Sequence, residues 1–185
     1  MKKFDKKNWC GICLLTISMF FSCSDYELPE HKLDVEFRYE LTCSDVLLKY
    51  ASPEVTITDV NGMQRTFLID DNMWDGNEHK KWIQSFHYDS LNVSNTMMVK
   101  YIPKAGVEFQ DEPAFDSFHN LSCLINVSED NLGGPDDFTI IPDFPSKVNV
   151  SASALKAYIE GLSSKTIIRG GSVDLNGNIT RVEND

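Results

Sequence analysis

Basic side chains are scarce in this chain of 185 residues, which has 17 Lys and Arg against 28 Asp and Glu and a formal net charge of −11 at pH 7. A surface of this charge repels phosphate backbones and anionic lipid head groups. We therefore expect no nucleic-acid partner. The acidic excess is adequately explained as a solvated surface.

Motifs for catalysis and cofactor binding are also lacking. The four histidines are scattered, with no HExxH and no close His/Asp spacing of the kind found in zinc sites or catalytic triads. Gly133-Gly134 is not a phosphate loop, because no Lys follows it and no strand-to-helix pattern frames it. We expect no catalytic residue, no metal and no cofactor, and we predict that the chain is not an enzyme.

Two acidic segments come nearest to a calcium motif. An EF-hand needs oxygen ligands at its first, third and fifth positions and Gly at the sixth. Counted from Asp71, the third position is Met73; counted from Asp174, the sixth is Ile179. The motif fails in both, and the second segment is better explained as a hairpin turn. A calcium site of another type in 70–78 or 130–137 stays open.

The chain begins with a basic segment and a short apolar run. The run from Trp9 to Phe21 would span about 20 Å as a helix, whereas a bilayer core is about 30 Å thick. It is too short to cross a membrane, but a basic start followed by such a run is typical of a signal peptide. The basic residues are Lys2, Lys3, Lys6 and Lys7.

The end of this run resembles a bacterial lipoprotein signal. Ser22-Cys23 matches the small residue and the cysteine of that signal, although the preceding Phe20-Phe21 departs from its usual aliphatic and small residues. The acidic stretch 24–27 is similar to the surface-export tag of Bacteroidota-type lipoproteins. The resemblance implies that Cys23 is lipidated on its sulfur and becomes the first residue of the mature protein. An ordinary signal peptide and a short anchor helix remain alternatives.

The expected organisation follows from this cleavage point: a signal peptide over 1–22, the lipidated Cys23 and a tether over 23–33, and one domain over 34–185. Loss of 1–22 removes four lysines and one aspartate and would lower the net charge to −14. The CxxC of Cys10 and Cys13 lies in the removed part and is discounted as a redox or metal site.

Period-two alternation predicts a half-buried strand over 34–43, where Val35, Phe37, Tyr39, Leu41 and Cys43 share one face. We expect a short crossing segment over 44–52 and a loop over 111–119. Further strands are predicted over 53–59, 64–69, 82–88, 97–102, 107–109, 121–128, 138–141 and 147–150, and the chain closes with the segment 166–168 and a hairpin within 172–182.

Asn61-Gly62 and Asn176-Gly177 each separate two strand-like runs and predict hairpins. For the first pair we expect a type I′ turn, in which both central residues have positive φ. Residues 151–163 change to a helical period, with a serine at 151 or 153 as the cap. Many short strands with one late helix predict a mainly β fold, an immunoglobulin-like antiparallel β-sandwich with one C-terminal helix and a closing hairpin.

The stretch 40–50, the strand 55–59, the hairpin at Asn61-Gly62 and the closing segment 174–178 together resemble small Bacteroidota-type lipoproteins. The resemblance implies an immunoglobulin-like or transthyretin-like sandwich, in a group mostly without assigned function. It brings no catalytic residue to this chain.

Cys43 and Cys123 both fall on the apolar faces of predicted strands. A disulfide between them requires Cα atoms about 4.4–6.8 Å apart, which facing strands of a sandwich can supply. The alternative is two buried free thiols that pack as small hydrophobic side chains. A nucleophilic role is disfavoured, because neither residue has a histidine nearby in the sequence.

Two surface sites complete the list of candidates. Trp74 lies in a polar loop and is a candidate ligand contact, whereas Trp82, Phe86 and Tyr88 are better explained as core residues of one strand. Asp89-Ser90-Leu91 resembles the Bacteroidota O-glycosylation signal, which would place a sugar on Ser90.

Taken together, these observations predict a lipid-anchored protein of the cell envelope. We expect it to be attached through Cys23 to the outer membrane, facing the periplasm or the surface. We expect a non-catalytic binding or structural module with a protein or glycan partner. The alternative is a hydrolase acting on envelope glycans.

Overall fold

The computed structural model describes residues 32–76, 79–129 and 147–184. The predictions for the signal peptide, for Cys23 and most of the tether, and for a strand over 138–141 lie outside the described residues. Described by itself, the unit that begins at Lys32 is a β-sandwich.

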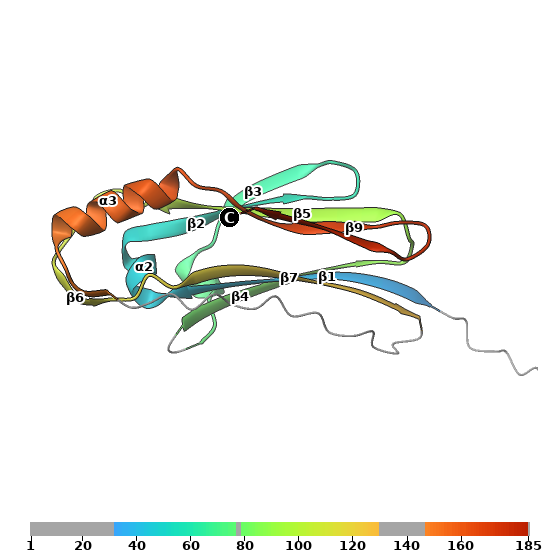
Figure 1. Cartoon of the computed structure of the whole chain (residues 1–185), viewed down its shortest axis with the longest axis horizontal. Coiled ribbons are helices and arrows are strands. Elements are labelled where there is room, and N and C mark those ends of the chain that lie inside the picture. Colours follow the sequence, from blue (N-terminus) through green and yellow to red (C-terminus); the bar gives the residue numbers. More distant parts are fainter. Residues whose placement is uncertain (1–31, 77–78, 130–146, 185) are drawn as a thin grey trace, which may run out of the picture. The chain divides into compact units, whose positions relative to one another are not determined.

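Two antiparallel sheets face each other in this unit (Figure 1). One has the strand order β4-β1-β7 and the other β10-β9-β5-β2-β3, while β6 and β8 form a separate pair. The predicted mainly β antiparallel sandwich, with a late helix and a closing hairpin, is confirmed. The strands are β1 (Leu33–Ser44), β2 (Ala51–Thr58), β3 (Gln64–Leu68), β4 (His79–Tyr88), β5 (Val93–Pro103), β6 (Glu112–Phe115), β7 (His119–Glu129), β8 (Lys147–Val150), β9 (Ile167–Val173) and β10 (Ile179–Asn184).

The core lies between the two sheets. The alternation predicted for β1 is confirmed, because its apolar residues from Val35 to Cys43 are fully buried. Residues Val55, Met97, Val99 and Tyr101 from β2 and β5 close the other side of the core. Because β1 is paired on both edges, with β4 and with β7, it is the central strand of its sheet.

Both Asn-Gly hairpins form, but the predicted type I′ turn is wrong. Within each Asn-Gly pair only the glycine has a positive φ, 73° at Gly62 and 78° at Gly177, while Asn61 and Asn176 do not. In each turn the glycine N–H donates to the carbonyl three residues earlier. This is a type I turn followed by a left-handed glycine, a common three-residue hairpin loop.

Two connections differ from expectation. The crossing segment after β1 forms a short helix, α2 (Asp45–Tyr50), capped by the Ser44 hydroxyl. No strand forms over 107–109, and the predicted loop over 111–119 instead contains β6. Only pairing with the distant β8 makes β6 a strand, so local composition could not reveal it.

The predicted late helix is α3 (Ala152–Ser163), and its cap is Ser151, whose Oγ accepts the Ala154 N–H at 3.3 Å. Leu155, Ile159 and Leu162 form its buried face, against the sheet at β5. In Figure 1, α2, β6 and α3 lie at the same end of the sandwich, and the candidate site is there.

Candidate functional site

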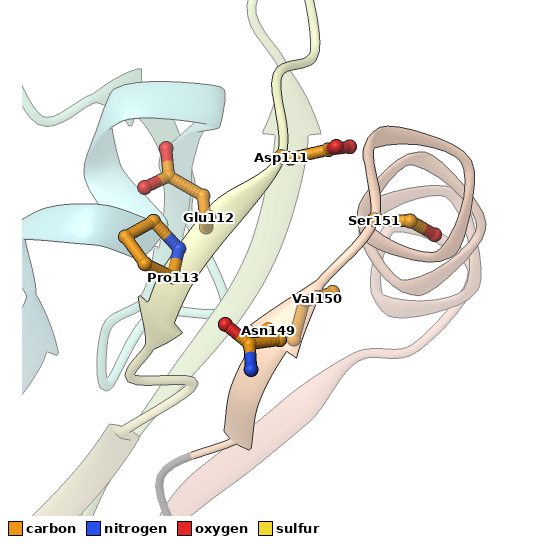
Figure 2. Close-up of a pocket in the computed structure, with 6 residues that line it drawn as sticks. All are labelled: Asp111, Glu112, Pro113, Asn149, Val150 and Ser151. Atoms are coloured by element: carbon orange, nitrogen blue, oxygen red, sulfur yellow. The ribbon is translucent and has the colours of Figure 1, made fainter.

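A hollow of about 300 Å³ opens where β6, β8 and the start of α3 meet (Figure 2). Glu112 of β6 is opposite Val150 of β8, and the chain runs from Val150 directly into the cap of α3. The lining residues are Asp111, Glu112, Pro113, Asn149, Val150 and Ser151. None of the ligand-contact or modification sites predicted from the sequence lines it.

Glu112 is held by α2. Its Oε1 accepts a hydrogen bond from Lys49 Nζ at 2.7 Å and a second one from the Tyr50 hydroxyl. The hydrogen bond from Lys49, followed by that from Tyr50, lowers the pKa of Glu112, and the same contact with Glu112 raises the pKa of Lys49. Tyr50 is itself buried, with its ring stacked on Phe109 at 5.2 Å. The carboxylate therefore stays ionised and fixed in place.

Asp111 serves the start of α3. Its Oδ1 accepts the backbone N–H of Ala152 at 2.8 Å, beside the cap bond made by Ser151. Together these two side chains satisfy backbone donors that a helix start otherwise leaves without partners. Figure 2 shows the two carboxylates pointing apart, Glu112 toward α2 and Asp111 toward α3.

The chemistry of the hollow follows from these bonds. A glycoside hydrolase needs one carboxylic acid with a raised pKa to protonate the leaving oxygen and a second carboxylate facing it. Here the pKa of Glu112 is lowered, and Asp111 turns away from it to cap a helix. The two carboxylates hold α2, β6 and α3 together rather than form an acid–base pair.

A second group of reactive side chains is buried in the core beside β5. Cys43 Sγ lies 3.2 Å from the Tyr101 hydroxyl, and the Tyr101 ring packs edge-on against His119 at 5.1 Å. Cys43 and His119 are opposite each other on β1 and β7. Sequence reasoning missed this pairing, because only the strand register reveals it.

Burial makes this group a poor nucleophile. It raises the pKa of Cys43 to about 12, and it lowers the pKa of His119, whose Nδ1 donates to the Ser117 carbonyl at 2.8 Å. A reactive cysteine needs a lowered pKa and access to solvent, whereas Cys43 is fully buried.

The structure does not bring the two cysteines together, so the disulfide alternative is corrected. Cys123 is opposite Tyr39 on β1, four residues from Cys43. That offset is about 13 Å along a strand, well beyond the reach of a disulfide. Both cysteines are buried free thiols, as the alternative held. The sequence placed both on apolar faces but contained no information on their register.

A buried polar bridge links the two sheets near Cys123. The Tyr39 hydroxyl of β1 donates to Asn95 Oδ1 of β5 at 2.9 Å, and Asn95 Nδ2 donates to the Tyr88 hydroxyl of β4 at 2.8 Å. Burial raises the pKa of Tyr39 far above its usual value and that of Cys123 to about 12. These groups therefore stay protonated and serve as hydrogen-bond partners and packing.

The surface candidates have different surroundings. Trp74 is half-buried and packs against the core, so its side chain is less available than a loop position suggests. Ser90 is exposed in the turn between β4 and β5, where a modifying enzyme has access. Trp82 is buried, and Phe86 and Tyr88 are half-buried, in line with the preferred core interpretation of that strand.

Two histidines gain acidic partners that sequence spacing did not predict. His79 Nε2 lies 2.9 Å from Asp116 Oδ2, and His87 Nδ1 lies 3.1 Å from Asp34 Oδ1. All four side chains are substantially solvent-accessible, and ion pairs in such positions contribute little stability. Within residues 32–76, 79–129 and 147–184, no group of three or more His, Cys, Asp or Glu side chains is arranged to hold a metal ion.

Comparison with protein-family models, with curated proteins and with solved structures finds no match for this chain. None of the helices that the structure describes combines the length and the apolar character needed to cross a bilayer. Function is therefore inferred from the residues of the chain itself.

Proposed function

We propose that this chain is a lipid-anchored envelope protein whose β-sandwich is a non-catalytic binding or structural module. The observation that carries the proposal is the position of Cys23. It ends a basic and apolar signal-like segment, and it lies only ten residues before Leu33, where the sandwich begins.

This spacing limits where the domain can work. Ten residues reach at most about 35 Å when fully extended. A lipid on Cys23 would therefore keep the sandwich within roughly that distance of the membrane surface. The partner, whether a protein or a glycan, would have to be met close to the membrane. The acidic surface, at a formal net charge of −11 for the whole chain, disfavours contact with the anionic head groups themselves.

The state of the reactive groups supports a non-catalytic role. Cys43 and Cys123 are buried with raised pKa values, and Glu112 is held ionised by Lys49 and Tyr50. Each group has a structural partner or is out of reach of a substrate. The alternative of a glycan hydrolase gains nothing from the hollow, whose carboxylates lack the required pKa and orientation.

The test is the intact mass of the membrane-extracted protein. We expect the wild type to have the mass of residues 23–185 plus acyl chains, and Cys23→Ala to lose the acyl mass and leave the detergent phase. Cys13→Ala is the matched control, since this cysteine lies in the segment that would be removed and its loss should leave the mature mass unchanged. A wild-type mass without acyl chains would refute the anchor.

A further inference from the structure

The edge strand β10 is exposed to solvent along its whole length. All six of its residues are exposed, including Ile179 at 41% and Val182 at 45%. Among the described strands, β10 pairs with β9 on one side only. An exposed edge of this kind presents a row of backbone donors and acceptors to which another strand can add.

The hairpin geometry shows which backbone groups face outward. Asp174 N–H donates to the Asn178 carbonyl at 3.0 Å, so this pair is hydrogen-bonded. Hydrogen-bonded and non-hydrogen-bonded pairs alternate along an antiparallel ladder. Thr180 and Val182 therefore bond to β9, while Ile179, Arg181 and Glu183 direct their N–H and C=O groups away from the sheet.

The side chains at the outward-facing positions have opposite charges. Arg181 and Glu183 lie two residues apart and are therefore on the same face of β10. Their charges act in opposite directions on the pKa of the Cys123 thiol of β7, which Arg181 lowers and Glu183 raises. We propose that β10 is a self-pairing edge, which joins two copies of this chain across a two-fold axis at Val182.

This register satisfies both the backbone and the charges. A two-fold axis makes the two β10 strands antiparallel, and centring it on Val182 places Arg181 of each copy opposite Glu183 of the other. Both are outward-bonding positions, as a hydrogen-bonded pair requires. Shifting the centre by one residue would place Arg181 opposite Arg181, or Glu183 opposite Glu183, which is destabilising.

The resulting assembly is one continuous sheet made of two five-stranded sheets. A strand of six residues is about 20 Å long, and such an edge buries less than the roughly 1,200 Å² of a standard interface. We therefore expect a weak, concentration-dependent dimer. The proposal rests on the backbone row and the order of the charges, and it does not depend on lipidation.

Cysteine cross-linking tests the register. Cells that produce the full chain are treated with copper phenanthroline, and dimers are counted on a non-reducing gel. Val182→Cys places two thiols at a close non-hydrogen-bonded pair, with Cα atoms about 4.5 Å apart. Thr180→Cys is the matched control on the same face of the same strand, because its two copies would lie about 13 Å apart.

We expect dimers of Val182→Cys to form at least about tenfold faster than those of Thr180→Cys or of the wild type, whose native cysteines set the background. The double variant Thr180→Cys/Asn184→Cys should cross-link again, since Thr180 is opposite Asn184 of the second copy. Equal rates for Val182→Cys and Thr180→Cys would overturn the proposal.

Charge reversal then separates pairing from random collision. In the Val182→Cys background, Arg181→Glu places Glu opposite Glu and should slow cross-linking about tenfold. Adding Glu183→Arg restores opposite charges and should restore the rate. Circular dichroism of the purified variants checks that each is folded. A cross-linking rate that is insensitive to Arg181→Glu, or not rescued by the double reversal, would also overturn the proposal.

Discussion

Cys43 illustrates how burial decides the chemistry of a single residue. Its thiol is fully enclosed, and its Sγ lies 3.2 Å from the hydroxyl of the equally buried Tyr101. Desolvation disfavours the thiolate, which raises the pKa of Cys43 above the usual range of a thiol to about 12. Cys43 lies opposite His119, as in a catalytic pair, but burial makes it a packing residue.

This shift predicts a loss of stability at alkaline pH. The folded-state pKa lies above the unfolded one, so the contribution is fully present below about pH 9 and is lost as the pH rises toward 12. Between pH 9 and 11, Cys43→Ala should reduce the fall in unfolding free energy by about 2 kcal/mol relative to wild type. Urea titrations at the two pH values measure this difference. The packing lost in the variant cancels, because it is the same at both pH values.

An unchanged pH dependence in Cys43→Ala would mean that the thiol titrates in the folded protein as it does in the unfolded chain. It would then be accessible to solvent, and the assignment of Cys43 as an inert core residue would be wrong.

At the scale of elements, the two Asn-Gly hairpins are stabilised by the same set of hydrogen bonds. Asp59 and Asp174 each accept two backbone N–H groups through Oδ1, from the residues two and four positions later. These bonds stabilise a turn that returns the chain through a left-handed glycine. The pKa of the Asp174 carboxyl is lowered, first by the side-chain hydrogen bond from Asn178 and then by these backbone N–H groups. The aspartate two residues before each asparagine thus stabilises this turn, and the prediction from Asn-Gly alone left this contribution out.

Gly62 provides a test of this turn. A Cβ at this position meets nothing within 4 Å, so a substitution changes only the cost of its positive φ. Gly62→Ala should lower the unfolding free energy by about 1–2 kcal/mol, whereas Gly62→Asn should cost less, because Asn tolerates the left-handed region. Urea denaturation of both variants measures the difference. Equal losses would show that the left-handed conformation is not what limits this position.

At the scale of the whole domain, two glycines of β9 allow close approach of neighbouring strands and of the opposite sheet. A Cβ on Gly170 would overlap the Asn95 carbonyl of β5 and lie 3.1 Å from the Tyr39 hydroxyl of β1. A Cβ on Gly171 would overlap the Thr180 carbonyl of β10 and lie 2.8 Å from Ile125 Cδ1 of β7. The buried Tyr39–Asn95–Tyr88 bridge lies at this point.

Gly171→Ala should therefore destabilise the whole sandwich. The Thr180 carbonyl is a backbone atom of β10 and cannot move without shifting the strand. We therefore expect the unfolding free energy to fall by at least about 2 kcal/mol, because of overpacking. Gly161→Ala is the matched control: it lies within α3 with open space around its Cβ, and it should stabilise the protein by about 0.5–1 kcal/mol. Thermal and urea unfolding of both variants measure the contrast. A neutral Gly171→Ala would mean that the β10 backbone lies farther from Gly171 than described.

The sequence by itself determined most of the secondary structure, because periodicity, turn residues and caps act over a few positions. The alternation of β1, the late helix with a serine cap at 151 or 153 and the sites of both hairpins follow from such local patterns. Only the tertiary structure decided what the chemically interesting residues do. Tyr39 meets Asn95 across 56 positions, Tyr50 meets Glu112 across 62, and Asp111 meets the start of α3 across 41. These contacts depend on which strands pair and in which register, and pairing energies are summed over whole strands rather than encoded in any short stretch.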